Sequence, residues 1–268
     1  KPLLYILIFC FCTFNSETEV MESTTTLEST TTTSLVQDMP STNKNPSFEL
    51  PYQHQFIELE NCNNLKVIGR AGVGVDNVDL DVATKNKILV MNTPLGNLEA
   101  TAELTVGLMF SLYRHIHNAN TSTHEGKWEK AKFMGTELKG KTLGIVGFGN
   151  IGQRVAEICK VIGMQILTNS NSASDEVLNF FDARKVSTEE LLSSSDVLSL
   201  HTKLNDQTKN MLNKESIATM KSSSVIINCA RGGLINESDL KDALNNDVIA
   251  GAAVDVYENE PATENVMF

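Results

Sequence analysis

The sequence predicts an α/β protein built around a doubly wound parallel sheet, with a second, incomplete α/β unit before it. Two observations support this fold class. Short apolar runs that suit buried strands alternate with helical patterns from residue 142 to residue 256, and a glycine-rich turn follows the first of these runs. Alternating strands and helices are typical of parallel sheets whose helices cover both faces.

The glycine-rich turn lies in Thr142–Gly152, T-L-G-I-V-G-F-G-N-I-G. Gly147 makes the turn tight, Gly149 lets backbone approach a pyrophosphate, and Gly152 lets the next helix pack close to the strand. That helix, about Gln153–Ile162, offers unpaired N–H groups to phosphates at its start. A bare G-x-G-x-x-G also occurs in plain turns, but the flanking strand and helix favour dinucleotide binding over a structural turn.

Composition argues against several classes of function. The chain has 268 residues and a net charge of −11, and its lysines and arginines do not cluster, so we expect neither nucleic-acid binding nor a membrane surface. Five cysteines, with no C-x-x-C pair, favour a reducing compartment, and we expect a cytoplasmic protein without a metal site.

The first 47 residues differ from the rest. Lys1–Phe14 is a nearly continuous apolar run behind one cation, about as long as a signal-peptide core. Asn15–Pro46 is rich in serine and threonine, which cannot form a packed core. A secretory signal with a stalk, an unusual extension and sequence outside the mature protein are the open interpretations. We favour the last, and expect residues 1–47 to be disordered or outside the mature fold.

Two domains follow this segment. Residues 48–98 are expected to be the remnant of a substrate domain, with strands at Leu65–Ile68 and Ile88–Met91. Residues 99–268 are expected to form a dinucleotide-binding domain that opens with a long helix over Ala100–His117.

After the glycine turn, strands and helices continue to alternate. Further strands are predicted at Gln165–Thr168, Val197–Leu200, Val225–Asn228 and Ala250–Val256. A capping box at Ser187 and Glu190 starts one helix, and Asn236 starts another. Ligands of such sheets bind at the carboxyl ends of the strands.

Polar residues follow three of these strands. Arg231, beside two glycines, could grip a carboxylate with its planar guanidinium, although a structural ion pair is the alternative. Asp255 could accept a hydrogen bond from a bound amide and Glu260 could raise the pKa of a histidine, although both could be mere loop acids. His201 follows another strand, where a histidine is more often a structural group than a catalyst.

Five segments resemble the D-isomer-specific 2-hydroxyacid dehydrogenases. They are Arg70–Leu80 (R-A-G-V-G-V-D-N-V-D-L), Ile88–Pro94 (I-L-V-M-N-T-P), Gly126–Gly152, Ile227–Ile235 (I-N-C-A-R-G-G-L-I) and Ala252–Pro261 (A-A-V-D-V-Y-E-N-E-P). The resemblance covers about Leu65 to Val266. Within it, the run W-E-K-A-K-F-M-G-T-E-L points to the members that act on phosphoglycerate.

The resemblance implies an NAD-dependent enzyme with an incomplete flavodoxin-like substrate domain and a Rossmann dinucleotide-binding domain. Its cofactor contacts would be Gly147, Gly149, Asn150, Ile151, Gly152, Ser170, Thr202, Cys229, Ala230, Arg231 and Asp255. Arg231 would orient the carboxylate of a phosphorylated 2-hydroxy acid. Glu260 would pair with a histidine that takes the C2 hydroxyl proton as hydride leaves. A homodimer through Ala100–His117 and Trp128–Leu138 is also implied.

The chain departs from the family pattern in two places. None of its histidines (His54, His115, His117, His124 and His201) matches the catalytic one, which follows the family's last strand in a motif resembling C-P-H. Residues 264–268 resemble only the start of that strand, so we expect an inactive fragment. Ser170 replaces the ribose-binding acid expected about 20 residues beyond the glycines, which weakens the preference for NAD over NADP.

The favoured function is NAD-dependent oxidation of 3-phospho-D-glycerate to 3-phosphohydroxypyruvate, the first step of serine biosynthesis. One alternative is a glyoxylate or hydroxypyruvate reductase of the same family, which a substrate loop without phosphate-binding cations would favour. The other is a non-catalytic NAD-binding protein like the transcriptional corepressors that share this fold, which a peptide groove in the substrate domain would favour.

Overall fold

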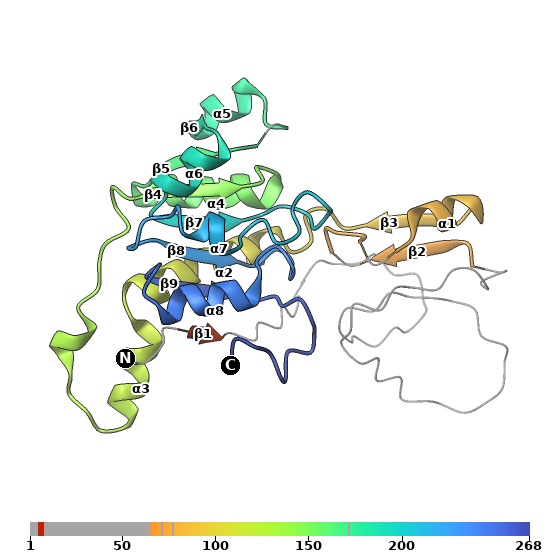
Figure 1. Ribbon diagram of the computed structural model, residues 1–268. Helices are drawn as coiled ribbons and strands as arrows, with labels where there is room; N and C mark the ends of the chain where they lie inside the picture. The colour runs from red at the N-terminus through yellow and green to blue at the C-terminus, as the bar shows by residue number, and fades with distance from the viewer. Residues whose placement is uncertain (1–4, 8–64, 71, 77, 171) are drawn as a thin grey trace, which may run out of the picture. The chain divides into compact units, whose positions relative to one another are not determined.

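The computed structural model describes residues 5–7, 65–70, 72–76, 78–170 and 172–268 (Figure 1). The described residues belong to two units, one containing residues 65–98 and the other containing residues 5–7 and 99–268. Our expectations for the rest of the first 64 residues, including the serine- and threonine-rich stretch, lie outside the described residues.

The larger unit contains a seven-stranded sheet in which every neighbouring pair of strands is parallel. Its order is β1-β9-β8-β7-β4-β5-β6, with β1 at Tyr5–Leu7, β4 at Thr142–Val146, β5 at Gln165–Thr168, β6 at Ala183–Lys185, β7 at Val197–Leu200, β8 at Val225–Asn228 and β9 at Gly251–Val254. The chain runs outward from β4 to β6, returns to the other side of β4 at β7, and continues to β9. The predicted doubly wound sheet is confirmed, and its order reverses between β4 and β7, where such sheets bind ligands.

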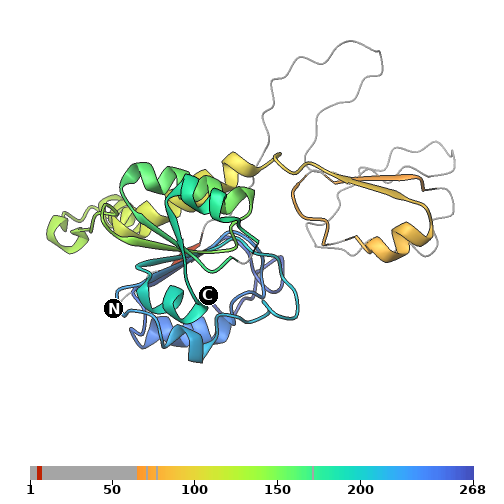
Figure 2. The ribbon, with the colours of Figure 1, turned by 90° about the horizontal axis from the view of Figure 1, so that it is seen from above.

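Helices cover both faces of this sheet (Figure 2), because its strands are apolar on both sides. In β8, Val225 and Ile227 belong to one buried cluster, and Ile226 between them belongs to the other. The first cluster includes residues of α2 (Leu98–Tyr113), α4 (Asn150–Ile162) and α5 (Asp175–Phe181), and the second includes residues of α6 (Thr188–Ser194), α7 (Lys214–Ile217) and α8 (Glu237–Asn245).

The helix predicted over Ala100–His117 is interrupted, because α2 ends at Tyr113. His115 has a left-handed backbone with φ of 53°, and a second helix, α3 (Ile116–His124), begins after it. The Tyr113 carbonyl accepts a hydrogen bond from the Thr136 N–H at 2.9 Å, a contact between segments more than 20 residues apart. The helical pattern of the sequence carries no sign of this contact, so the prediction of one long helix was wrong.

Residues 116–138, called the arm below, consist of α3, the 3₁₀ helix η1 (Lys130–Phe133) and the segments beside them. Trp128 and Met134 on the arm are 87% and 82% exposed. A hollow of about 390 Å³ is lined by His115, Asn118, Thr121, Ser122, Glu125, Lys127, Glu129, Lys132 and Phe133. None of these lining residues belongs to the sheet.

The sequence analysis predicted neither α5 nor β6, because both are short and bury little. Only Leu178 of α5 is buried, and Ser174 caps the helix by accepting the Val177 N–H. The capping box expected at the start of α6 forms in part. Ser187 Oγ accepts the Glu190 N–H at 3.1 Å, whereas the Glu190 carboxylate accepts a hydrogen bond from Arg184 at 2.7 Å.

The edge of the sheet beyond β9 differs from the expectation. The backbone of Tyr5–Leu7 pairs with Ala252–Val254, so three of the residues expected outside the fold form an edge strand. Residues 264–268, which resemble the start of a strand, instead form turns in which the Phe268 N–H donates to the Asn265 carbonyl at 3.1 Å. The strand predicted at Ala250–Val256 is also shorter, and ends at Val254.

The smaller unit pairs β2 (Val67–Arg70) in parallel with β3 (Leu89–Asn92), with α1 (Leu80–Lys85) between them in the chain. Its buried residues are Leu65, Ile68, Val78, Ala83 and Ile88. Relative to the prediction, β2 begins and ends two residues later. Among the described residues, no helix combines the length and hydropathy needed to cross a bilayer, and no cluster of side chains could hold a metal ion.

Candidate functional site

The carboxyl ends of five neighbouring strands carry the residues that the sequence singled out. The residues that follow these strands are Gly147 after β4, Ser170 after β5, Thr202 after β7, Cys229, Ala230 and Arg231 after β8, and Asp255 after β9. All these ends meet at one edge of the sheet because the strands are parallel and adjacent. We call it the carboxyl edge.

The glycines of the turn after β4 differ in their surroundings. Gly147 has a φ of 87°, and a Cβ there would lie 2.5 Å from the His201 carbonyl oxygen. A Cβ on Gly152 would collide with the carbonyl oxygen of Gly147. A Cβ on Gly149 would meet nothing within 4 Å. Two glycines therefore allow close packing of backbone, and the third leaves open space in front of α4.

That open space suits the phosphates of a dinucleotide. Gly149 is the N-cap of α4 and supplies no side-chain cap, and Asn150 and Ile151 are the first helical residues. The N–H groups of a first helical turn have no partner within the helix, and the helix dipole favours negative charge there. The turn and the thirteen-residue helix thus form a cradle that fits a pyrophosphate.

His201 supports the turn from β7. Its N–H donates to the Val146 carbonyl at 2.8 Å, and its Nε2 lies 2.8 Å from Oγ of Ser199, which is 1% exposed. Burial lowers the pKa of His201 from 6.5 to about 4, so the ring is neutral at physiological pH. These contacts favour the structural interpretation of His201 over the catalytic one.

The loop after β8 is held by a residue that the sequence analysis did not select. Asn228 is 2% exposed; its Oδ1 accepts the Ala230 N–H at 3.0 Å, and its Nδ2 donates to the Arg231 carbonyl at 2.9 Å. A Cβ on Gly232 would collide with the Tyr257 carbonyl, so this loop also packs against the segment after β9. An amide at the end of an otherwise apolar strand was the available sequence signal.

Acidic residues gather at the neighbouring end of β9. The Asp255 N–H donates to the Asn228 carbonyl at 3.0 Å, and Glu260 Oε1 accepts the Tyr257 N–H at 3.0 Å. Burial, together with the negative charges of Glu237, Asp255 and Glu260, raises the pKa of Tyr257 to about 12. Asp255 and Glu260 therefore lie close enough to Tyr257 to disfavour its ionisation.

Ser170 lies at the end of β5 in a small group of hydroxyls. It is 8% exposed, its N–H donates to Thr168 Oγ1 at 3.2 Å, and its Oγ lies 3.1 Å from Ser172 Oγ. Thr168 Oγ1 in turn donates to the Ile145 carbonyl of β4 at 2.8 Å. The contact with Ser172 holds the Ser170 side chain, and the bonds of Thr168 tie the backbone at the end of β5 to β4.

Comparisons with known proteins show what the chain is similar to. Residues 106–268 match the family model described as D-isomer specific 2-hydroxyacid dehydrogenase, NAD binding domain. The chain is 46% identical over 202 residues to D-3-phosphoglycerate dehydrogenase of Bacillus subtilis (strain 168), covering 75% of this chain and 38% of that protein. It is 45% identical over 206 residues to D-3-phosphoglycerate dehydrogenase of Homo sapiens, covering 77% and 39%. The chain thus spans about two fifths of the length of these relatives.

Solved structures show the same likeness. A glyoxylate reductase from Paecilomyes thermophila superposes with a TM-score of 0.70 and 39% identity, covering 75% of this chain and 61% of that one. D-Lactate dehydrogenase from Aquifex aeolicus, complexed with NAD and lactic acid, superposes with a TM-score of 0.69 and 32% identity, covering 74% and 60%.

Proposed function

The chain belongs to the D-isomer specific 2-hydroxyacid dehydrogenase family, and on that basis we propose that it is the NAD-binding part of an enzyme that oxidises 3-phospho-D-glycerate to 3-phosphohydroxypyruvate, the first step of serine biosynthesis. The observation that carries this proposal is the cradle at the start of α4, in a chain that is 42–47% identical to several D-3-phosphoglycerate dehydrogenases.

In this proposal, bound NAD supplies the hydride acceptor, and the residues of the chain bind and orient. The α4 N-terminus holds the pyrophosphate, and Asp255 accepts a hydrogen bond from the carboxamide. Arg231 orients the substrate carboxylate through the two parallel hydrogen bonds that a guanidinium offers. The Asn228 side chain holds the backbone of Ala230 and Arg231, so the Arg231 side chain extends from a fixed point of the loop.

The proton of the C2 hydroxyl requires a general base. His201 does not suit that task, because its ring is committed to Ser199 and burial lowers its pKa to about 4. We assign Glu260 the task of pairing with a histidine base, because a carboxylate partner raises the pKa of an imidazole toward neutrality. None of the five histidines of the chain follows Glu260 in the sequence.

The experiment that tests the proposal is a titration of the chain with NADH, followed by titration of the loaded protein with 3-phosphohydroxypyruvate and with glyoxylate. We expect NADH to bind, and the phosphorylated ligand to bind more tightly than glyoxylate. Arg231→Gln is expected to weaken the binding of 3-phosphohydroxypyruvate at least about tenfold, since it removes a pair of charge-assisted hydrogen bonds. Absence of NADH binding would overturn the proposal.

A second candidate substrate is glyoxylate or hydroxypyruvate. The likeness to the glyoxylate reductase at 39% identity favours it. Tighter binding of glyoxylate than of 3-phosphohydroxypyruvate in the same titration would support this candidate over the first.

The proposal extends to a homodimer formed through residues 100–117 and residues 128–138, the second of which form the later part of the arm. Trp128 and Met134 expose large apolar side chains there, and such surfaces are typical of protein interfaces. We also propose a reducing, cytoplasmic location, because Cys159 and Cys229, among the described residues, are both free thiols. Cell fractionation with an antibody tests the location, and recovery from a secretory fraction would contradict it.

A further inference from the structure

We infer that the carboxyl edge accepts NADP as well as NAD, because two serine hydroxyls stand at the end of β5 where NAD-binding sheets of this type carry a carboxylate. The inference rests on the proposed function, since it concerns the same dinucleotide. In such sheets the carboxylate hydrogen-bonds the ribose 2′-hydroxyl and excludes the 2′-phosphate of NADP by charge repulsion.

Ser170 occupies the place of that acid. It follows β5, the strand next to β4 and its glycine turn, and it stands 23 residues beyond Gly147. Its Oγ lies 3.1 Å from Ser172 Oγ, and its backbone N–H is bound to Thr168 Oγ1. A hydroxyl both donates and accepts, so this pair suits a ribose hydroxyl and a phosphate oxygen alike.

A cation lies in the neighbouring strand. Lys185 of β6 is the register partner of Thr168, and register partners in a parallel sheet point to the same face. Ser170 lies two residues, about 6.6 Å, beyond Thr168, and neighbouring strands are about 4.8 Å apart, so the Cα atoms of Lys185 and Ser170 are about 8 Å apart. A phosphate bound at the Ser170 hydroxyl lies between them, within reach of the four-carbon stem of Lys185.

Lys185 is exposed, and the charges nearest to it in the sequence are either paired or equally exposed. Arg184 is bound to Glu190 at 2.7 Å, whereas no ion pair to Lys185 occurs among the described residues. Asp175 and Glu176, the next acids after Ser172, are exposed in the first turn of α5, where salt screens their charge. Lys185 is therefore the cation available to a 2′-phosphate at Ser170.

The test compares cofactors that differ only in that phosphate. The full chain is titrated with NADH and with NADPH, and each is displaced with 5′-AMP and with adenosine 2′,5′-bisphosphate to isolate the ribose contact. We expect the two dissociation constants to agree within about tenfold, because Ser170 stands where a repelling carboxylate would be and Arg184 is paired with Glu190.

Three variants assign the effect to its residues. Ser170→Asp is expected to weaken the binding of NADPH at least about tenfold, and to leave the binding of NADH as tight as before or tighter. Lys185→Gln is expected to weaken NADPH alone. The matched control is Ser223→Asp, which adds the same charge at an exposed turn before β8, at the opposite edge of the sheet, and is expected to leave the ratio of the two constants unchanged.

The outcomes separate this inference from the proposed function. If NADH binds and NADPH binds more than about tenfold more weakly, the inference is wrong and the proposed function stands. If neither binds, the proposed function itself fails. If Ser170→Asp does not fold by circular dichroism, Ser170→Ala replaces it. That variant is expected to weaken NADPH about threefold or more through loss of a donor, and unchanged NADPH binding would overturn the inference.

Discussion

At the scale of single residues, Gly149 and Gly152 allow an effect on the stability of the protein to be distinguished from an effect on NADH binding. Gly152→Ala places a methyl group against the Gly147 carbonyl, and we expect it to lower the free energy of unfolding by about 1–3 kcal/mol. Gly149→Ala places the same group in open space, so we expect a change in unfolding free energy of about 1 kcal/mol or less. It should nevertheless weaken the binding of NADH at least about tenfold, because the methyl group occupies the space that the pyrophosphate needs to come close to the backbone.

Urea unfolding and NADH titration of both variants measure these two quantities. Each variant serves as the control for the other, because both add one methyl group to the same turn. Undiminished NADH affinity in Gly149→Ala would show that the phosphates bind elsewhere.

His201 should make stability depend on pH. Its pKa is about 4 in the folded protein and 6.5 for an unperturbed histidine, so the unfolded chain binds more protons between these values. The stabilisation from keeping His201 neutral is complete above pH 6.5 and is lost as pH falls toward 4. At pH 4.5 the loss amounts to about 2–3 kcal/mol relative to pH 7.

His201→Gln removes this titration, so the difference between the unfolding free energies at pH 7 and pH 4.5 should shrink by that amount. The matched control is His117→Gln, at an exposed position of α3, which we expect to leave the difference unchanged. An equal pH dependence of the wild type and His201→Gln would mean that the ring is not buried in its neutral form.

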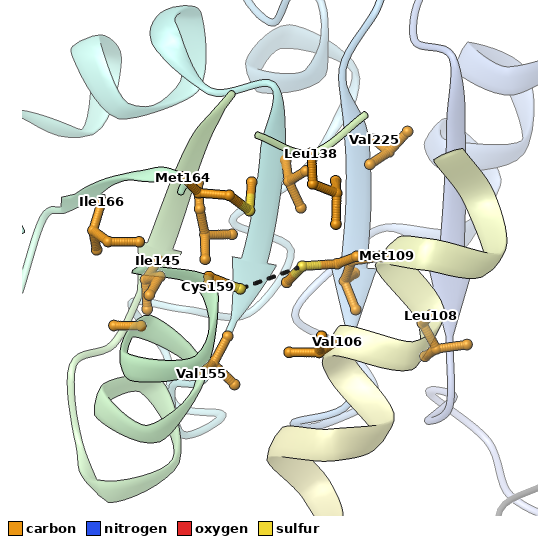
Figure 3. Close-up of a cluster of buried hydrophobic side chains, with 14 of the residues drawn as sticks. Val106, Leu108, Met109, Leu138, Ile145, Val155, Cys159, Met164, Ile166 and Val225 are labelled. Carbon is orange, nitrogen blue, oxygen red and sulfur yellow. Dashed lines mark hydrogen bonds between the residues drawn. The ribbon is translucent and has the colours of Figure 1, made fainter. Parts of the chain in front are cut away.

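At the scale of elements, α2 and α4 are joined by a buried cluster in which sulfur atoms meet. Met109 of α2 and Cys159 of α4 are both 0% exposed, and their sulfur atoms lie 3.9 Å apart (Figure 3). Met109→Ala should leave a cavity between the two helices and lower the free energy of unfolding by about 2–5 kcal/mol. Val161→Ala, at an 87% exposed position of α4, should change it by about 0.5 kcal/mol or less. Thermal or urea unfolding measures both, and equal effects would contradict the packing.

At the scale of the whole molecule, the arm exposes two large apolar side chains, Trp128 and Met134, to solvent. If the proposed homodimer forms, light scattering of the purified chain should give twice the mass of one chain. Trp128→Ser should raise the dimer dissociation constant at least about tenfold, because a central aromatic side chain contributes much of the binding energy of an interface. Phe180→Ser, at a 75% exposed position of α5, is the matched control and should leave the mass unchanged. A wild-type mass of one chain at micromolar concentration would refute the dimer.

The sequence by itself determined the strands of the sheet centre and the turn between β4 and α4. Gln165–Thr168, Val197–Leu200 and Val225–Asn228 have the predicted bounds, because strands buried on both faces need unbroken apolar runs. Glycines at fixed offsets likewise indicated the position of the turn, since Gly147 and Gly152 each meet a steric requirement of the backbone.

Only the tertiary structure decided which distant residues meet. The break after Tyr113 depends on Thr136, the loop after β8 depends on the buried amide of Asn228, and the neutral state of His201 depends on its burial beside Ser199. Local patterns report the preferences of residues a few positions apart, whereas these features arise from hydrogen bonds and desolvation that exist only once the strands lie side by side.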